Sequence, residues 1–231
     1  MSEGPLGRLE PTDWGHVERY PLSALPEPPR GVPSPIGVNW YAEFDRPAKG
    51  SDRRWRVAVD GRLTRLRGGH CVVVPPRRFI DPASWWTFYN QGAEGACVGF
   101  GISRAMSLLN RRRYDARWLY HVAQHHDEYP QTPPEEGTSV RAGLDILRNV
   151  GHRRVWGNVA GWPNPVEGIS ANRWATNIDE WLLATGWEGA DEVPLLNSWG
   201  RAYPHVVWVR VDPVLTRLLR EDGEFSIITD R

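Results

Sequence analysis

A glutamine and a cysteine six residues apart form the pattern with the clearest chemistry in this chain. A short glycine-containing loop separates Gln91 from Cys97, and an apolar-periodic helix is predicted to begin at Cys97. A thiol at a helix N-terminus faces unpaired backbone N–H groups and the positive end of the helix dipole, which favours the thiolate. The side-chain amide of Gln91 and the backbone N–H of Cys97 are two donors for a developing oxyanion. The spacing therefore indicates nucleophilic chemistry at Cys97.

Two segments of the chain resemble papain-like cysteine peptidases. Residues 91–100, QGAEGACVGF, are similar to the active-site segment of that superfamily, and residues 197–200, NSWG, are similar to its second motif. The matching positions of the first segment are Gln91, Gly92, Gly95, Cys97 and Phe100. The resemblance is to the bacterial and phage-type branch, and it extends over about residues 85–230.

The resemblance implies a role for each matching residue. Cys97 attacks as a thiolate, Gln91 and the Cys97 N–H hold the oxyanion, and Asn197 orients the imidazole of a general base. The supporting positions are Trp199, Ser198 and Gly95. The tryptophan is expected to shield the hydrogen bond between asparagine and imidazole. The implied activity is cleavage of a peptide, isopeptide or related amide bond, with no metal or organic cofactor.

The active-site segment departs from the family pattern at two positions. Glu94 stands where the family has a disulfide-bonded cysteine, and Val98 stands where it has a tryptophan. Loss of the disulfide partner fits a reducing compartment.

The catalytic histidine is not at its usual place in the chain. The family carries it between the cysteine and the asparagine, on a strand beside the second motif, but no histidine occurs between His152 and His205. Residues 170–176, where that strand is expected, resemble a helix more than a strand.

We expect His70 to be the displaced base. Residues 68–74, GGHCVVV, resemble the family's histidine strand although they precede Cys97. A sheet that lacks one strand has an unpaired edge, which another strand could cover. The hypothesis is that residues 68–74 pair beside residues 195–197 and bring His70 to Cys97, while strand alternation turns Cys71 away. The alternative is that His70 merely ends a strand at a Gly-Gly turn.

The other histidines have weaker patterns. His205 is a second candidate base, but it begins the strand after Asn197, on the wrong side. His152 is predicted to be a cation at a helix C-terminus. His121 and His125 have the i, i+4 spacing of zinc ligands, but no third ligand motif is evident, so a solvated helix face is predicted.

Length and composition narrow the classes of protein. The 231 residues suffice for one large domain or two lobes, and the formal net charge of zero gives no indication of a nucleic-acid or membrane partner. No apolar run approaches a membrane span, no signal-peptide core is present, and two cysteines cannot form a disulfide scaffold. A cytoplasmic protein, or a part of a virion assembled in the cytoplasm, is expected.

The predicted fold is α+β and papain-like, with a helical lobe over about 85–152 and a barrel-like antiparallel sheet lobe from about 37–80 and 153–231. Residues 1–36 are rich in proline and are predicted to form an extended arm that could bind a protein partner. Predicted helices cover residues 97–112, 116–127, 139–150, 171–185 and 213–221, with Thr138 or Ser139 as the cap of the third. Predicted strands cover residues 55–59, 71–74, 193–196, 206–211 and 225–229.

Two other functions are open from the sequence. The chain could be a papain-like fold without catalysis that serves as a structural or binding subunit of a larger assembly, such as a phage virion. It could also be an amidase that acts on cell-wall peptides.

Overall fold

A computed structural model describes residues 20–21, 30–78, 89–127, 137–155, 166–167, 171–175, 177–221 and 223–229. Most of the predicted arm, residues 1–36, lies outside these ranges. Its predicted boundary is too late, however, because the long strand β2 begins at Ser34.

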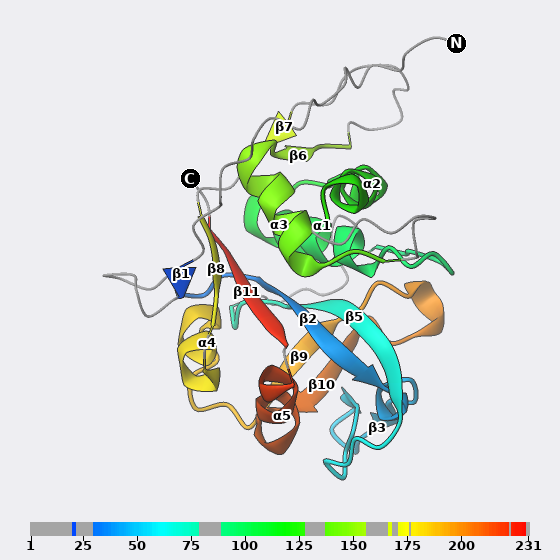
Figure 1. Cartoon of the computed structure of the whole chain (residues 1–231). Helices are drawn as coiled ribbons and strands as arrows, with labels where there is room; N and C mark the ends of the chain where they lie inside the picture. Colours follow the sequence, from blue (N-terminus) through cyan, green and yellow to red (C-terminus); the bar gives the residue numbers. More distant parts are fainter. Residues whose placement is uncertain are drawn as a thin grey trace.

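The described part of the chain is α+β, as predicted (Figure 1). The helices are α1 (Cys97–Asn110), α2 (Ala116–His126), α3 (Val140–Asn149), α4 (Ile178–Thr185) and α5 (Thr216–Arg220). The longer strands are β2 (Ser34–Tyr41), β5 (Leu66–Val74), β8 (Ala171–Trp174), β9 (Glu192–Leu196), β10 (Val206–Arg210) and β11 (Glu224–Thr229). Two-residue strands are β1 (Tyr20–Pro21), β3 (Ala48–Lys49), β4 (Trp55–Arg56), β6 (His152–Arg153) and β7 (Val166–Glu167).

The main sheet is open, which corrects the barrel-like lobe expected from the sequence. Among the described residues its strand order is β1-β8-β11-β2-β5-β9-β10-β4-β3. The pairs β1–β8 and β10–β4 are parallel, and the other pairs are antiparallel. Strand β5 lies in the middle of this order, between β2 and β9, so both of its edges are paired.

Helices cover both faces of the sheet, and each face has its own apolar core (Figure 1). Helices α1, α2 and α3 pack on the face that contains Cys71 and Val73. Helices α4 and α5 pack on the opposite face, against Val72 and Val74. Because neighbouring side chains of a strand point to opposite faces, β5 contributes to both cores.

The capping residues at the two ends of α3 were predicted correctly from the sequence. The Ser139 side chain accepts a hydrogen bond from the Ala142 N–H at 3.0 Å and caps α3, as predicted, and Gly151 follows the helix with a φ of 95°. Helix α1 begins at Cys97 without a side-chain cap. Its first-turn N–H groups are therefore not occupied by a capping side chain.

Two predicted elements differ from the structure. Residues 171–174 form strand β8 rather than the start of a helix, and α4 begins only at Ile178, where Asn177 caps it. The predicted strand over residues 55–59 ends after Arg56, because Ala58 has a φ of 47°, a conformation incompatible with an extended strand.

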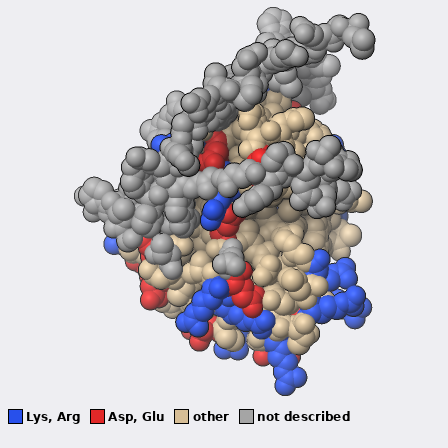
Figure 2. All heavy atoms as spheres, viewed as in Figure 1, with Lys and Arg blue, Asp and Glu red and all other residues tan. Residues whose placement is uncertain are grey.

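No helix in the described part of the chain is long and apolar enough to cross a membrane. Acidic and basic side chains are interspersed over the face shown in Figure 2, with Lys and Arg gathered along its lower edge.

Candidate functional site

His70 and Asn197 meet where β5 and β9 lie side by side. Val73 of β5 is paired with Leu196 of β9, which confirms the predicted pairing of these two segments. The His70 Nε2 lies 3.0 Å from the Asn197 Oδ1, which also accepts the Ser198 N–H at 2.7 Å. An amide oxygen only accepts, so the Nε2 of His70 carries the proton and its Nδ1 can accept another. Asn197 thus selects the tautomer that a general base requires.

Aromatic rings enclose the His70 imidazole. The ring centroids of Trp40 and Trp199 lie 4.6 and 5.0 Å from it, and His70 is only 8% exposed. Burial lowers the pKa of His70 to about 4, although the Asn197 hydrogen bond and the charge of Asp45 act in the opposite direction. The imidazole is therefore neutral at neutral pH.

The Cys97 thiol lies at the first residue of α1, beside the strand that carries His70. Backbone hydrogen bonds from Cys71, Val98 and Cys97 itself lower the pKa of this thiol. Since Cys71 follows His70 directly on β5, its N–H places the sulfur next to that strand. Burial nevertheless has the larger effect and raises the pKa of Cys97 above its usual value of 9.0. Desolvation therefore opposes the thiolate that the helix N-terminus favours, and it has a larger effect on the pKa than the backbone donors.

Cys71 lies on the other face of β5 from His70, but this is the face on which Cys97 packs, so Cys71 is not turned away from Cys97 as the permuted arrangement predicted. It is buried in the core formed with α1, where a Cβ on Gly101 would come within 2.6 Å of its Sγ. Burial raises the pKa of Cys71 well above its usual value. This second thiol is therefore an internal reference for the reactivity of Cys97.

Gln91 connects the cysteine segment to the asparagine loop. Its backbone N–H donates to the Ser198 carbonyl at 2.8 Å, and its Nε2 donates to the Glu94 carbonyl at 3.0 Å. The side chain is buried, and one hydrogen on the Nε2 remains beyond the bond to Glu94. The Glu94 carboxylate pairs with Arg117 of α2 at 2.9 Å. Gly95 lies in the same loop, half-buried.

Two residues that were not predicted from the sequence also contact this site. Trp40 packs edge-on against His70, and the Arg104 Nη1 donates to the Asn197 carbonyl at 2.7 Å. An aromatic cluster at Trp40, Tyr41 and Phe44 could have indicated the first. Arg104 has no such signal, because a charged helical residue is ordinarily assigned to the solvent face.

The remaining histidines lie elsewhere. His205 lines a groove together with Trp55, Trp187 and Trp208. His152 is a correction: it is fully buried, stacked 4.9 Å from the Tyr114 ring, and burial lowers its pKa to about 3, so it is a neutral core residue and not a helix-end cation.

No metal site is formed within the described ranges. His121 and His125 are exposed, as expected for a solvated helix face. No group of three or more His, Cys, Asp and Glu side chains among the described residues could hold a metal ion.

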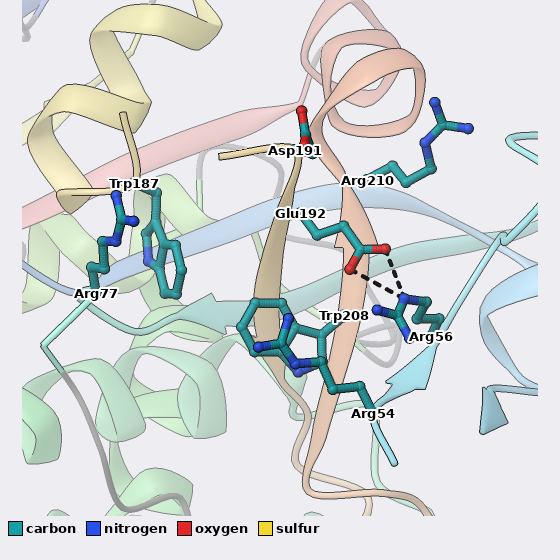
Figure 3. A pocket seen from close by; sticks show the side chains of 8 residues that line it. All are labelled: Arg54, Arg56, Arg77, Trp187, Asp191, Glu192, Trp208 and Arg210. Atoms are coloured by element: carbon teal, nitrogen blue, oxygen red, sulfur yellow. Dashed lines mark hydrogen bonds and ion pairs between the residues drawn. The ribbon is translucent and has the colours of Figure 1, made fainter. Parts of the chain in front are cut away.

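The hollow in Figure 3, of about 560 Å³, is lined by Arg54, Arg56, Arg77, Trp187, Asp191, Glu192, Trp208 and Arg210. The Arg56 Nε lies 2.8 Å from the Glu192 Oε1, so two of the lining charges neutralise each other. Arg54 covers the Trp208 ring at 4.1 Å. None of the predicted site residues lines this hollow, which makes it distinct from the site at Cys97.

Comparison of the chain with the profiles of known protein families, with curated proteins and with solved structures gave no match.

Proposed function

We propose that this chain is a papain-like cysteine hydrolase that cleaves a peptide or related amide bond through Cys97. The observation that carries the proposal is the His70–Asn197 hydrogen bond of 3.0 Å on a strand whose next backbone N–H contacts the Cys97 thiol. The histidine strand precedes the cysteine in this chain, so the arrangement is a permuted form of the one the family resemblance implies. The open sheet and the helices of its two faces then correspond to the two lobes.

The pKa directions favour a general-base mechanism over a preformed ion pair. The neutral His70 accepts the thiol proton on its Nδ1 as the Cys97 sulfur attacks the substrate carbonyl carbon. The Gln91 Nε2 and the Cys97 N–H donate to the oxyanion of the tetrahedral intermediate. When the C–N bond breaks, His70 returns the proton to the leaving amine, and a thioester remains. Water, deprotonated by His70, then attacks the thioester and regenerates the thiol.

Labelling with an epoxysuccinyl peptide tests the proposal. We expect one adduct, on Cys97, because ring opening requires an activated thiol and an enclosed site, whereas Cys71 is buried. The measurement is peptide mapping by mass spectrometry together with the rate of labelling between pH 5 and 9. His70→Ala and Asn197→Ala are expected to slow labelling by at least about 100-fold, since general-base catalysis contributes on this scale.

Iodoacetamide provides the matched control because it reacts with any accessible thiolate. A chain in which Cys97 alkylates only at alkaline pH and with equal rates in wild type and His70→Ala would have no functional base. That outcome would contradict the proposed hydrolase activity.

The second candidate is a papain-like fold without catalysis that acts as a structural or binding subunit, for example in a phage virion. The observation that favours it is that burial holds both the thiol and the imidazole in their neutral forms. Unreactive Cys97 in a folded protein supports this candidate. The proline-rich segment of residues 1–36 would then be the part to test for binding to a protein partner.

A further inference from the structure

Arg104 is a buried charged residue on the helix that carries the nucleophile. It follows Cys97 by seven residues, which is close to two helical turns, so the two side chains leave α1 on the same side. Arg104 is 0% exposed and lies among the residues of α1 that pack against other elements. An aliphatic side chain at such a position would avoid the desolvation of a cation, and replacing buried charges by apolar residues is often neutral or stabilising. Packing alone therefore does not account for an arginine.

Arg104 is connected to His70, the proposed general base, through hydrogen bonds to Asn197. Its Nη1 donates to the Asn197 carbonyl at 2.7 Å, and the side chain of the same asparagine accepts from His70 at 3.0 Å. Arg104 thus fixes the backbone of the residue whose amide fixes the imidazole.

A second contact ties the same loop to the cysteine segment. The Gln91 N–H donates to the Ser198 carbonyl at 2.8 Å, and Asn90 forms a β-bridge with Trp199. The segment from Asn90 to Arg104, which contains Cys97, therefore holds the asparagine loop at both ends. These contacts determine the position of the Cys97 thiol relative to His70.

We propose that Arg104 is a positioning residue that holds the Asn197 loop in the register required for His70 to serve Cys97. The inference rests on the proposed hydrolase function. Burial lowers the pKa of Arg104 to about 9, so the side chain stays protonated at neutral pH and keeps its donors. Without it, the Asn197 backbone is free to shift and His70 is no longer held as one tautomer.

The test compares Arg104→Met, Arg104→Lys and a control, Met106→Leu. Met106 is fully buried on the same helix, and its side chain leaves the helix about 200° around the axis from that of Arg104. The first readout is ¹⁵N NMR of the His70 ring, which reports tautomer and pKa and does not depend on catalysis. In wild type and Met106→Leu we expect one Nε2-protonated tautomer. In Arg104→Met we expect mixed tautomers and a pKa that moves from about 4 toward 6.5.

The second readout is the rate of epoxysuccinyl labelling of Cys97. Arg104→Met is expected to lower it by about 10- to 100-fold, by analogy with the loss seen when a residue that orients a metal ligand is removed. Arg104→Lys should recover part of the rate, because an ammonium donates one hydrogen bond to a carbonyl but lacks the planar fork. An unchanged His70 tautomer and an unchanged rate in Arg104→Met would overturn the inference.

The two failures are distinguishable. If wild-type Cys97 does not react with the epoxysuccinyl peptide, the proposed hydrolase function is wrong. If wild type reacts and Arg104→Met reacts equally, only the role of Arg104 is wrong. If Arg104→Met does not fold, Arg104→Gln, whose side chain is too short to span the same distance, has the same expected and contradicting outcomes.

Discussion

At the residue scale, two histidines are buried in their neutral forms for different reasons. His70 lies against Trp40 and Trp199 with its Nε2 on Asn197, whereas His152 lies between helices with its Nε2 2.7 Å from the Ser103 Oγ. The first geometry leaves the Nδ1 of His70 able to accept a proton, and the second places His152 in the core of the helical layer. Burial alone therefore does not distinguish these two histidines, whereas their contacts do.

Both imidazoles should make the protein sensitive to acid. The pKa of His152 is about 3 in the folded protein and 6.5 in an ordinary environment, so the unfolded chain binds the proton more readily. The contribution of the neutral His152 to the free energy of unfolding is thus fully present above pH 6.5 and is lost as the pH falls toward 3. From pH 7.5 to 4.5 we expect His152 alone to lower the free energy of unfolding by about 2–3 kcal/mol, measured by urea denaturation.

His152→Gln isolates this contribution. The variant cannot titrate at this position, so it should lose less stability than wild type over the same pH range, whatever its stability at pH 7.5. His125→Gln, on an exposed face of α2, is the control and should follow wild type. Identical pH dependence in His152→Gln and wild type would contradict the prediction.

At the element scale, the sequence predicted the elements whose signals are local. Helix α3 has a serine cap and a terminal glycine, and α1 begins at the cysteine, as the apolar spacing indicated. Strand β8 has no local signal, because Ala171–Trp174 is short and is defined by its pairing with β11, which is more than 50 residues away in the chain. Non-local pairing of this kind overrides propensity.

The contact between α1 and α2 depends on Gly99. A Cβ at this position would lie 2.4 Å from the Ala116 carbonyl and 2.7 Å from the Tyr120 Cβ, and both are parts of α2 that cannot rotate away. We expect Gly99→Ala to force the two helices apart and to lower the free energy of unfolding by about 1–3 kcal/mol, the range for overpacking. Thermal and urea denaturation measure the change.

Gly69→Ala is the control for that substitution. A Cβ on Gly69 has nothing within 4 Å, so this variant should be as stable as wild type or slightly more stable. If Gly99→Ala is as stable as Gly69→Ala, the prediction that α1 and α2 require a glycine at position 99 is wrong. Because Cys97 and Gly99 share a helix, the labelling rate of Cys97 in Gly99→Ala also reports whether the nucleophile moves.

At the scale of the whole molecule, the candidate site joins three distant parts of the chain. His70 comes from β5, Gln91 from the loop before α1, Cys97 from the first residue of α1, and Asn197 from the residue after β9. The sequence allowed the β5–β9 pairing to be predicted, because a family-like sheet without its histidine strand has an edge that must be covered. It did not allow the open order of the sheet to be predicted, since strands β2 and β11 meet only through tertiary contacts.

The central place of β5 gives a prediction for fragments of the chain. The family resemblance covers about residues 85–230, but a fragment of residues 89–231 lacks β2 and β5, which fill the sheet between β11 and β9. Its β9 would have an unpaired edge, and the cores on both faces would lose β5 side chains such as Val72 and Val73. We expect this fragment to be unfolded or aggregated, whereas residues 30–231 should unfold cooperatively, as measured by circular dichroism during heating.

Addition of a separate polypeptide of residues 30–78 should restore structure to the short fragment and labelling of its Cys97, because that polypeptide brings both the missing strands and His70. A fragment of residues 89–231 that melts cooperatively by itself would show that β5 is an accessory strand, and a base for Cys97 would then have to come from the remaining chain.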